Sequence, residues 1–175
     1  MAGSINTIAH EWMETILTPN SVAVDATAGN GKDTYFLARR CQKVYAFDIQ
    51  TQAIENSKNY NKDFTNISYL CDSHENMNAY VLEKVDLIIF NLGYLPGSNH
   101  DITTNATSTK KALRNSMEIL KPNGSIIITS YIGHPGGLEE YHEVRNEATL
   151  LQLKLIKTFQ YENVSNSPIL LHFKK

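Results

Sequence analysis

The chain has 175 residues, of which 42% are hydrophobic and 19% charged, so it can bury the core of a compact domain and is not a disordered tail. A formal net charge of -2 and an isoelectric point near 6.3 exclude a globally basic nucleic-acid coat, although a local basic patch remains compatible with them. No apolar run approaches the roughly 18 residues that cross a bilayer, and the N-terminus lacks a signal-peptide pattern. We therefore expect a cytoplasmic protein that makes no membrane contact.

The spacing of the apolar residues predicts helices and strands in alternation. Residues 5–17 are expected to form a helix, because Ile8, Trp12 and Ile16 fall on one face and Pro19 ends it. In chain order there follow a strand over 22–26, a helix over 33–40, a strand over 44–47, a helix over 51–61, strands over 67–71 and 85–90, a helix over 108–120, a turn and a strand over 125–130, a helix over 138–151, and strands over 155–161 and 169–173.

This alternation predicts an α/β fold of the Rossmann-like type. Residues 85–90 are the most apolar run, which is typical of a central parallel strand buried on both faces. We expect a mostly parallel seven-stranded sheet with helices on both faces, closed by a C-terminal antiparallel hairpin. No repeat or linker interrupts the chain, so residues 1–175 are expected to form a single domain.

A glycine-containing loop, Asp25-Ala-Thr-Ala-Gly-Asn-Gly-Lys-Asp-Thr34, follows the first strand. Its glycines allow a tight turn and close approach of a ligand, and the next helix presents free N–H groups. A dinucleotide fingerprint would need glycine at the position of Thr34, and a P-loop would need Ser or Thr at the position of Asp33. The loop therefore argues against both NAD and a Walker-type phosphate site.

Acidic residues stand at the ends of three successive strands. Asp48 can accept hydrogen bonds from two ribose hydroxyls, and Asp72 can accept one from an adenine amino group. With Asp25, they match the arrangement in which S-adenosylmethionine (SAM) lies across the strand ends; alternatively, all three only cap strand and helix ends. The predicted SAM-binding residues are Asp25, Thr27, Gly29, Asn30, Gly31, Asp33, Thr34, Asp48, Ile49, Asp72, Ser73, His74, Asn91 and Gly93, and no metal site is predicted.

Three stretches together resemble the MnmM family of bacterial class I methyltransferases, formerly labelled rRNA methylases. They are residues 25–34 followed by Phe36-Leu-Ala, residues 91–97 (Asn-Leu-Gly-Tyr-Leu-Pro-Gly) and residues 133–137 (Gly-His-Pro-Gly-Gly). The resemblance, which spans about residues 5–175, implies SAM-dependent conversion of 5-aminomethyl-2-thiouridine to 5-methylaminomethyl-2-thiouridine at the tRNA wobble position, by a homodimer. Residues 98–101 and 131–132 depart from the family pattern, and these departures bear on substrate contacts more than on the SAM site.

Methyl transfer to an amine requires alignment of the nitrogen with the methyl group and a free nitrogen lone pair. Asn91 ends the central strand, where many amino-methyltransferases place a polar residue that accepts a hydrogen bond from the target nitrogen. Tyr94 can stack on the uracil, and His134, in a glycine-rich loop, can contact the substrate or accept a proton. The predicted catalytic residues are therefore Asn91, Tyr94 and His134, although a lone histidine is more often structural; His10, His100, His142 and His172 are interpreted as surface or helix residues.

A basic cluster, formed by Lys110, Lys111 and Arg114, opens the helix after the central strand. Such a cluster either binds anticodon-loop phosphates or forms an ordinary solvated helix face. The predicted partner is the anticodon stem-loop of tRNA, and the predicted substrate-binding residues are Leu92, Tyr94, Lys110, Lys111, Arg114, Tyr131, His134, Pro135 and Gly136.

Two other functions remain open at this point. One is a methyltransferase that acts on rRNA or on a small amine. The other is a non-catalytic SAM-binding or dimer-partner module, against which the intact segment 91–97 argues, since an inactive subunit need not keep a polar residue facing the methyl group.

Overall fold

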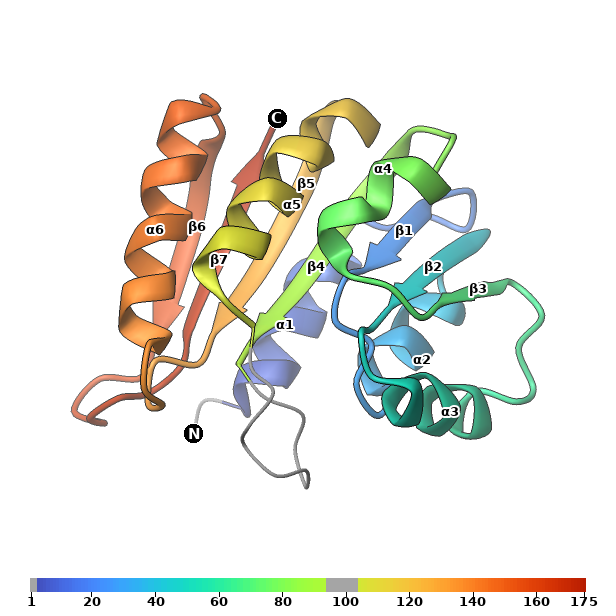
Figure 1. Cartoon of the computed structure of the whole chain (residues 1–175), viewed down its shortest axis with the longest axis horizontal. Coiled ribbons are helices and arrows are strands. Elements are labelled where there is room, and N and C mark those ends of the chain that lie inside the picture. Colours follow the sequence, from blue (N-terminus) through green and yellow to red (C-terminus); the bar gives the residue numbers. More distant parts are fainter. Residues whose placement is uncertain (1–2, 94–103) are drawn as a thin grey trace.

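The computed structural model, which describes residues 3–93 and 104–175, contains a seven-stranded sheet with the strand order β3-β2-β1-β4-β5-β7-β6 (Figure 1). The first five strands are parallel, and β7 runs antiparallel to both β5 and β6. The predicted mostly parallel sheet and its C-terminal hairpin are therefore confirmed. The strands are β1 (Val22–Asp25), β2 (Lys43–Phe47), β3 (Ile67–Leu70), β4 (Val85–Leu92), β5 (Leu120–Ser130), β6 (Lys154–Gln160) and β7 (Ile169–Lys174).

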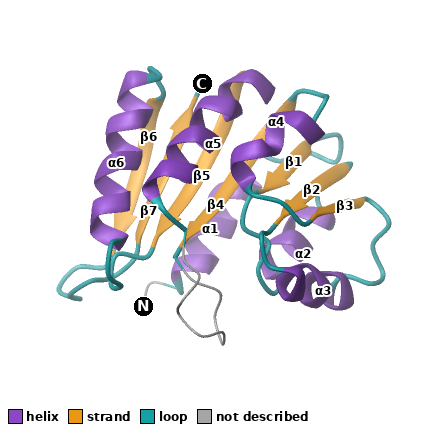
Figure 2. Ribbon diagram, viewed as in Figure 1, coloured by secondary structure: helices purple, strands orange, loops and turns teal. Residues whose placement is uncertain are grey.

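Helices pack on both faces of the sheet (Figure 2). One hydrophobic core lies between the sheet and the helices α4, α5 and α6, and a second lies between the sheet and the helices α1 and α2, with α3 beside α2. No helix in the described ranges is both long and apolar enough to cross a membrane. The helices are α1 (Ile5–Glu14), α2 (Lys32–Ala38), α3 (Thr51–Tyr60), α4 (Met77–Tyr80), α5 (Ala106–Ile119) and α6 (Gly137–Leu150), and a 3-10 turn, η1 (His74–Asn76), precedes α4.

Two local features differ from the sequence-based prediction. The turn expected before residue 125 lies inside the bounds of β5 and breaks its register, because Val85 pairs with Leu120 whereas Leu87 pairs with Ser125, and Asn123 adopts a positive φ of 64°. The short elements η1 and α4 were not predicted, since they contain too few residues to show helical periodicity.

The strand order indicates where a ligand would bind. Chain connections run from β1 outward to β2 and β3, and then return across β1 to β4 and β5. The order thus reverses between β1 and β4, and ligands of open α/β sheets bind at the carboxyl ends of the strands on either side of such a point.

Candidate active site

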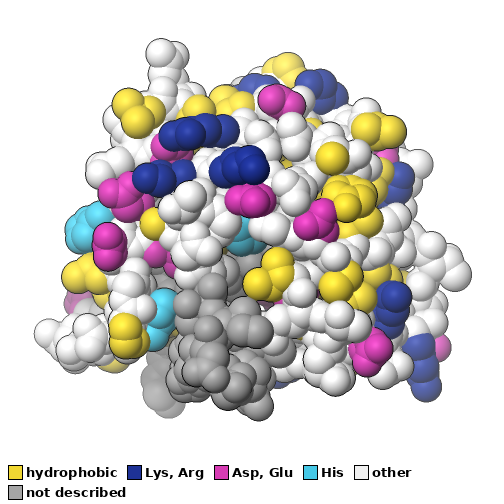
Figure 3. Space-filling model, viewed as in Figure 1, with side chains coloured by type: hydrophobic (Ala, Val, Ile, Leu, Met, Phe, Trp, Pro, Cys, Tyr) yellow, Lys and Arg dark blue, Asp and Glu magenta, His cyan; other side chains and the backbone are white. Residues whose placement is uncertain are grey.

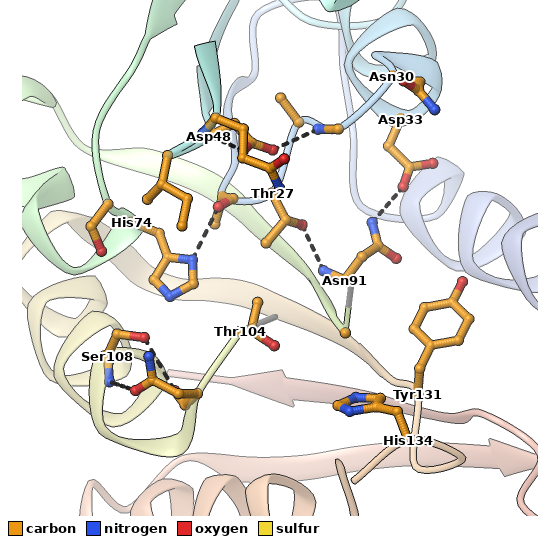
Figure 4. Close-up of a pocket in the computed structure, with 18 of the residues that line it drawn as sticks. Thr27, Asn30, Asp33, Asp48, His74, Asn91, Thr104, Ser108, Tyr131 and His134 are labelled. Atoms are coloured by element: carbon orange, nitrogen blue, oxygen red, sulfur yellow. Dashed lines mark hydrogen bonds between the residues drawn. The ribbon is translucent and has the colours of Figure 1, made fainter. Parts of the chain in front are cut away.

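A cavity of about 950 Å³ opens at the carboxyl ends of β1, β2 and β4 (Figure 4). Fourteen residues predicted from the sequence lie in its wall: Thr27, Gly29, Asn30, Asp33, Asp48, Ile49, Asp72, Ser73, His74, Asn91, Gly93, Tyr131, His134 and Pro135. Eight others lie outside the wall: Asp25, Gly31, Thr34, Leu92, Lys110, Lys111, Arg114 and Gly136. Tyr94 falls outside the described residues.

The glycine-containing loop is held in shape by Asp25, which is completely buried beneath it. One carboxylate oxygen accepts a hydrogen bond from the Thr34 hydroxyl at 2.6 Å, and the other accepts one from the backbone N–H of Thr27 at 3.2 Å. Gly31 has a φ of 83°, and a Cβ there would lie 2.6 Å from the Asn61 amide nitrogen and 2.8 Å from the Cα of Ser57. Asp25, Thr34 and Gly31 therefore shape the loop from behind the cavity wall.

Burial raises the pKa of Asp25 to about 7, and the negative charge of Asp33 adds to the shift. The folded protein therefore holds this proton more tightly than the unfolded chain, whose aspartate pKa is about 3.8. Between about pH 4 and pH 7 the unfolded state binds fewer protons, so the Asp25 contribution to stability falls as the pH rises. We expect Asp25→Asn to raise the free energy of unfolding of the ligand-free protein near pH 8, with a gain that shrinks toward pH 4.

Urea denaturation at a series of pH values measures this effect. The matched control is Asp63→Asn, since Asp63 is exposed. A pH dependence of Asp25→Asn parallel to that of the wild type would contradict the assignment of the titration to Asp25.

Asp48 joins the end of β2 to the loop. Its carboxylate accepts hydrogen bonds from the backbone N–H groups of Gly29 at 3.0 Å and Gln50 at 2.9 Å, and burial raises its pKa. These bonds fix the carboxylate in the cavity wall, where its remaining lone pairs can accept two neighbouring hydroxyls. Ile49 beside it is 55% exposed, so its apolar side chain is available to cover a flat ring.

Asp72 follows β3 and is anchored by three donors. It accepts hydrogen bonds from the Tyr80 hydroxyl at 2.7 Å, the Asn76 amide at 3.1 Å and the backbone N–H of Ser73 at 2.7 Å. The first two of these contacts are the main causes that lower the pKa of Asp72. The carboxylate is therefore ionised at neutral pH, and Asp72 lines the cavity.

His74 contributes a buried hydrogen-bond acceptor to the wall. Its Nδ1 lies 3.2 Å from the carbonyl oxygen of Ala26, so Nδ1 carries the hydrogen, and burial lowers the pKa of the ring. In the neutral ring Nε2 is an acceptor, and it has no partner among the residues that the structure describes. A ligand N–H or O–H group would satisfy this nitrogen.

The combination of donors and acceptors fits SAM. Loop N–H groups lie at the start of α2, Asp48 can accept two ribose hydroxyls, Ile49 can cover the adenine, and Asp72 and His74 offer acceptors for N–H groups. These residues would hold SAM, which supplies an electrophilic methyl group.

Asn91 ends β4 in the middle of the cavity wall (Figure 4). Its backbone N–H donates to the Thr27 hydroxyl at 2.7 Å, and its side-chain amide nitrogen donates to one oxygen of Asp33 at 2.7 Å. The other oxygen of Asp33 lies 2.6 Å from Nε2 of His10 on α1. The interpretation of His10 as an ordinary surface or helix residue was therefore incomplete, because α1 packs against α2 and brings His10 to the site. The interpretation of His172 was wrong, since His172 is buried in β7.

Tyr131 and His134 lie at the opposite side of the cavity from His74 (Figure 4). Burial raises the pKa of Tyr131, so its hydroxyl stays protonated, and that hydroxyl lies 3.4 Å from the Asn6 side-chain oxygen. The His134 ring packs against Gly137, where a Cβ would lie 2.9 Å from Nε2, and its Nδ1 is 3.0 Å from the carbonyl oxygen of Pro135. The Leu92 carbonyl accepts the Tyr131 N–H at 3.0 Å, and Leu92 does not line the cavity, whereas Asn91 does.

The predicted basic cluster lies on α5 and forms ion pairs with acidic residues. Lys110 pairs with Glu143 at 2.6 Å, Arg114 with Glu147 at 2.7 Å, and Lys111 with Glu75 at 3.7 Å. Figure 3 shows blue and magenta side chains side by side on this face. The cluster is thus a neutralised patch near the cavity, and phosphate binding by it remains a prediction.

Sequence reasoning missed several residues of the cavity wall. Some of them lie within or beside the recognised motifs but were not singled out, and others come from segments with no motif. The polar run 104–108, where α5 begins, has the composition of a helix N-cap, which was a usable signal. Asn6 and the loop between β6 and β7 gave none. The missed residues are Asn6, Ala26, Ala28, Lys32, Gln50, Glu75, Thr104, Asn105, Thr107, Ser108, Gly133, Asn166 and Pro168.

Comparison with known proteins agrees with this site. Residues 44–174 match the model of the family described as "Putative rRNA methylase". The chloroplastic tRNA (mnm(5)s(2)U34)-methyltransferase of Arabidopsis thaliana is 35% identical over 96% of this chain and 68% of its own length.

Two crystal structures share the fold. An rRNA-methylase from Clostridium thermocellum is 31% identical with a TM-score of 0.92, and a methyltransferase from Streptococcus mutans, solved in complex with S-adenosylhomocysteine (SAH), is 34% identical with a TM-score of 0.90. Each alignment covers 100% of this chain and 99% of the other. The chain therefore belongs to this rRNA methylase family and is a class I SAM-dependent methyltransferase.

Proposed function

We propose that this methyltransferase converts 5-aminomethyl-2-thiouridine to 5-methylaminomethyl-2-thiouridine at the tRNA wobble position. The observation that carries the proposal is the Asn91 side chain, whose amide nitrogen is occupied by Asp33 and whose oxygen is left to face the cavity. An acceptor at this place suits a nucleophile that carries N–H groups, as an aminomethyl group does. The similarity to the tRNA methyltransferase of Arabidopsis thaliana supports tRNA as the carrier.

Different side chains bind SAM, orient the amine and border the space for the base. The loop, Asp48 and His74 bind and orient SAM, and Asn91 directs the N–H of the substrate amine so that its lone pair points to the methyl group. Tyr131 and His134 border the space for the base. The amine loses its proton to water or to a nearby base before attack, and His134 is the candidate base on the substrate side.

The decisive experiment is nucleoside mass spectrometry of tRNA that carries unmethylated 5-aminomethyl-2-thiouridine, incubated with the protein and SAM. We expect a mass gain of one methylene group confined to that nucleoside, with none when SAM is omitted. No gain, together with calorimetric proof of SAM binding, would contradict this reaction and leave the methyltransferase assignment intact.

A second candidate is rRNA methylation, which the description of the family favours. Deproteinised rRNA and small ribosomal subunits, tested in the same assay with tritiated SAM, separate the two candidates. A small amine is the third acceptor to test, because the basic cluster on α5 is paired with glutamates.

We further propose that the chain forms one domain, works as a homodimer in the cytoplasm and binds the anticodon stem-loop. The single continuous seven-stranded sheet supports one domain, and the family resemblance supports the dimer and the tRNA substrate. Light scattering of the purified protein tests the dimer, and competition between whole tRNA and an isolated stem-loop tests the binding region.

The basic cluster offers a test of RNA contact. We expect Lys110→Ala with Lys111→Ala to raise the KM for tRNA about threefold to tenfold and to lower the salt dependence of binding, because each phosphate contact releases counterions. The glutamates Glu143 and Glu75 must release the lysines for this contact to form. The control is the double variant Lys43→Ala with Lys84→Ala, which removes the same charge at the start of β2 and directly before β4. Unchanged tRNA kinetics in the first variant would make the cluster an ordinary solvated surface.

A further inference from the structure

A chain of three side chains links the N-terminal helix to the centre of the cavity. His10 on α1 contacts Asp33 at 2.6 Å, and Asp33 accepts the amide N–H of Asn91 at 2.7 Å. The three residues are 23 and 58 positions apart in sequence. Asp33 at the start of α2 contacts Asn91 near the end of β4, and the packing of α1 against α2 adds His10 to this pair. The contact forms on the side of Asn91 away from His74 (Figure 4).

This chain determines which end of the Asn91 amide faces the substrate. A carboxylate oxygen accepts hydrogen bonds and does not donate them, so Asp33 can bind the amide nitrogen and would repel the amide oxygen. The backbone N–H of Asn91 is bound to Thr27, which prevents the residue from shifting along the strand end. The side-chain oxygen is consequently the polar atom of Asn91 that is turned into the cavity.

The direction of the amide matters for an amine nucleophile. An oxygen that accepts an N–H bond from the amine leaves the nitrogen lone pair available for attack. A reversed amide would place its NH2 group toward the amine and donate a hydrogen bond to that same lone pair. A reversed Asn91 would therefore still bind the amine while blocking transfer.

His10 is itself held in a fixed direction. Its ring stacks on Phe36 with centroids 3.9 Å apart and an interplanar angle of 18°, and the guanidinium of Arg40 lies over the Phe36 ring at 3.8 Å from its centroid. Only Nε2 reaches Asp33 in this arrangement. The stack thus fixes the position of Asp33 through a single hydrogen bond.

We propose that His10 is a positioning residue that acts through Asp33 to keep the Asn91 side-chain oxygen directed at the acceptor amine. The role of Asn91 in this statement rests on the proposed function. The N-terminal helix is accordingly part of the active site and not only a cover of the sheet, and it also supplies Asn6 to the cavity wall.

The kinetic test compares His10→Ala with His10→Gln, whose amide nitrogen can replace Nε2 as the donor to Asp33. With an anticodon stem-loop that carries 5-aminomethyl-2-thiouridine, we expect His10→Ala to lower kcat about tenfold with little change in KM, because misdirection of one group slows the reaction more than binding. His10→Gln should recover most of this loss. The control is Glu11→Gln, an exposed residue of α1 that takes no part in the chain from His10 to Asn91 or in the stack on Phe36.

A double-mutant cycle shows whether His10 acts through Asn91. In an Asn91→Ala background, His10→Ala should produce no further loss of kcat, since the group that it positions is absent. The proposal would be overturned if the loss of kcat in the double variant equalled the sum of the losses in the two single variants. A failure of His10→Gln to restore kcat would overturn it as well.

A measurement without substrate tests the positioning role of His10 independently of the proposed function. In ¹⁵N-labelled protein, the side-chain NH2 signals of Asn91, assigned by their loss in Asn91→Ala, should shift in His10→Ala and return toward the wild-type position in His10→Gln. If the wild type fails to methylate the stem-loop while these shifts occur, the proposed substrate is wrong and the positioning role stands. If the Asn91 signals are unaffected by His10→Ala, the positioning role is wrong whatever the substrate.

Discussion

Asn91→Ala is expected to lower kcat roughly a hundredfold while the Kd for SAM changes by less than about threefold. The substitution removes the amide oxygen that directs the amine, but it leaves Asp48, His74 and the glycine-containing loop in place. Single-turnover kinetics on modified tRNA and calorimetry with SAM measure the two quantities separately.

The matched control for this variant is Asn78→Ala. Asn78 lies on α4 and contacts Glu118 at 2.9 Å, outside the cavity wall. Its variant should keep the wild-type kcat. A kcat of Asn91→Ala close to that of the wild type would remove Asn91 from the mechanism and turn attention to Tyr131 and His134.

Asp48→Ala is expected to raise the Kd for SAM about thirtyfold to a hundredfold, which corresponds to the loss of roughly 2–3 kcal/mol of charge-assisted hydrogen bonding. The carboxylate contacts Gly29 and Gln50 in the wall at which a ribose would bind. Binding of tRNA in the absence of SAM should change little, because Asp48 lies away from the basic cluster on α5. Calorimetry with SAM and filter binding with tRNA make the comparison.

Two further variants control this result. Asp63→Ala removes an exposed aspartate from the same region of the chain and should leave the Kd for SAM unchanged. Asp48→Asn keeps an acceptor oxygen for only one of the two backbone N–H groups, so its free energy of unfolding is measured as well. A loss of SAM binding without a loss of folding stability then reports on the ligand and not on collapse of the loop. An equal loss of SAM and tRNA binding in Asp48→Ala would contradict the ribose assignment.

Several parts of the site could be predicted from chain order. The residues at the ends of β1, β2, β3 and β4 were placed together because parallel strands end at one edge of the sheet, and the strand order reverses there. Asp48, Asp72 and Asn91 all lie in the cavity wall for this reason. The local pattern that predicted the strands was therefore sufficient to predict much of the candidate SAM site.

Other parts depend on contacts between distant segments. Asp25 was assigned to SAM because it stands with Asp48 and Asp72 at the ends of three successive strands, but the structure buries its carboxylate under the loop, where it binds Thr34 and Thr27. The cluster on α5 was recognised as basic, but its partners Glu143 and Glu147 come from α6, more than 30 residues later. Neither outcome can be derived from residue spacing within one element.

The sequence by itself determined the fold class and the edge of the sheet that carries the site, because the alternation of strands and helices and the residues at strand ends are local properties of the chain. The tertiary structure alone decided how α1 docks, and so how His10 and Asn6 reach the cavity. The physical reason is that an amphipathic helix reveals which of its faces will be buried but not against which partner. The orientation of Asn91 follows from that docking, through Asp33.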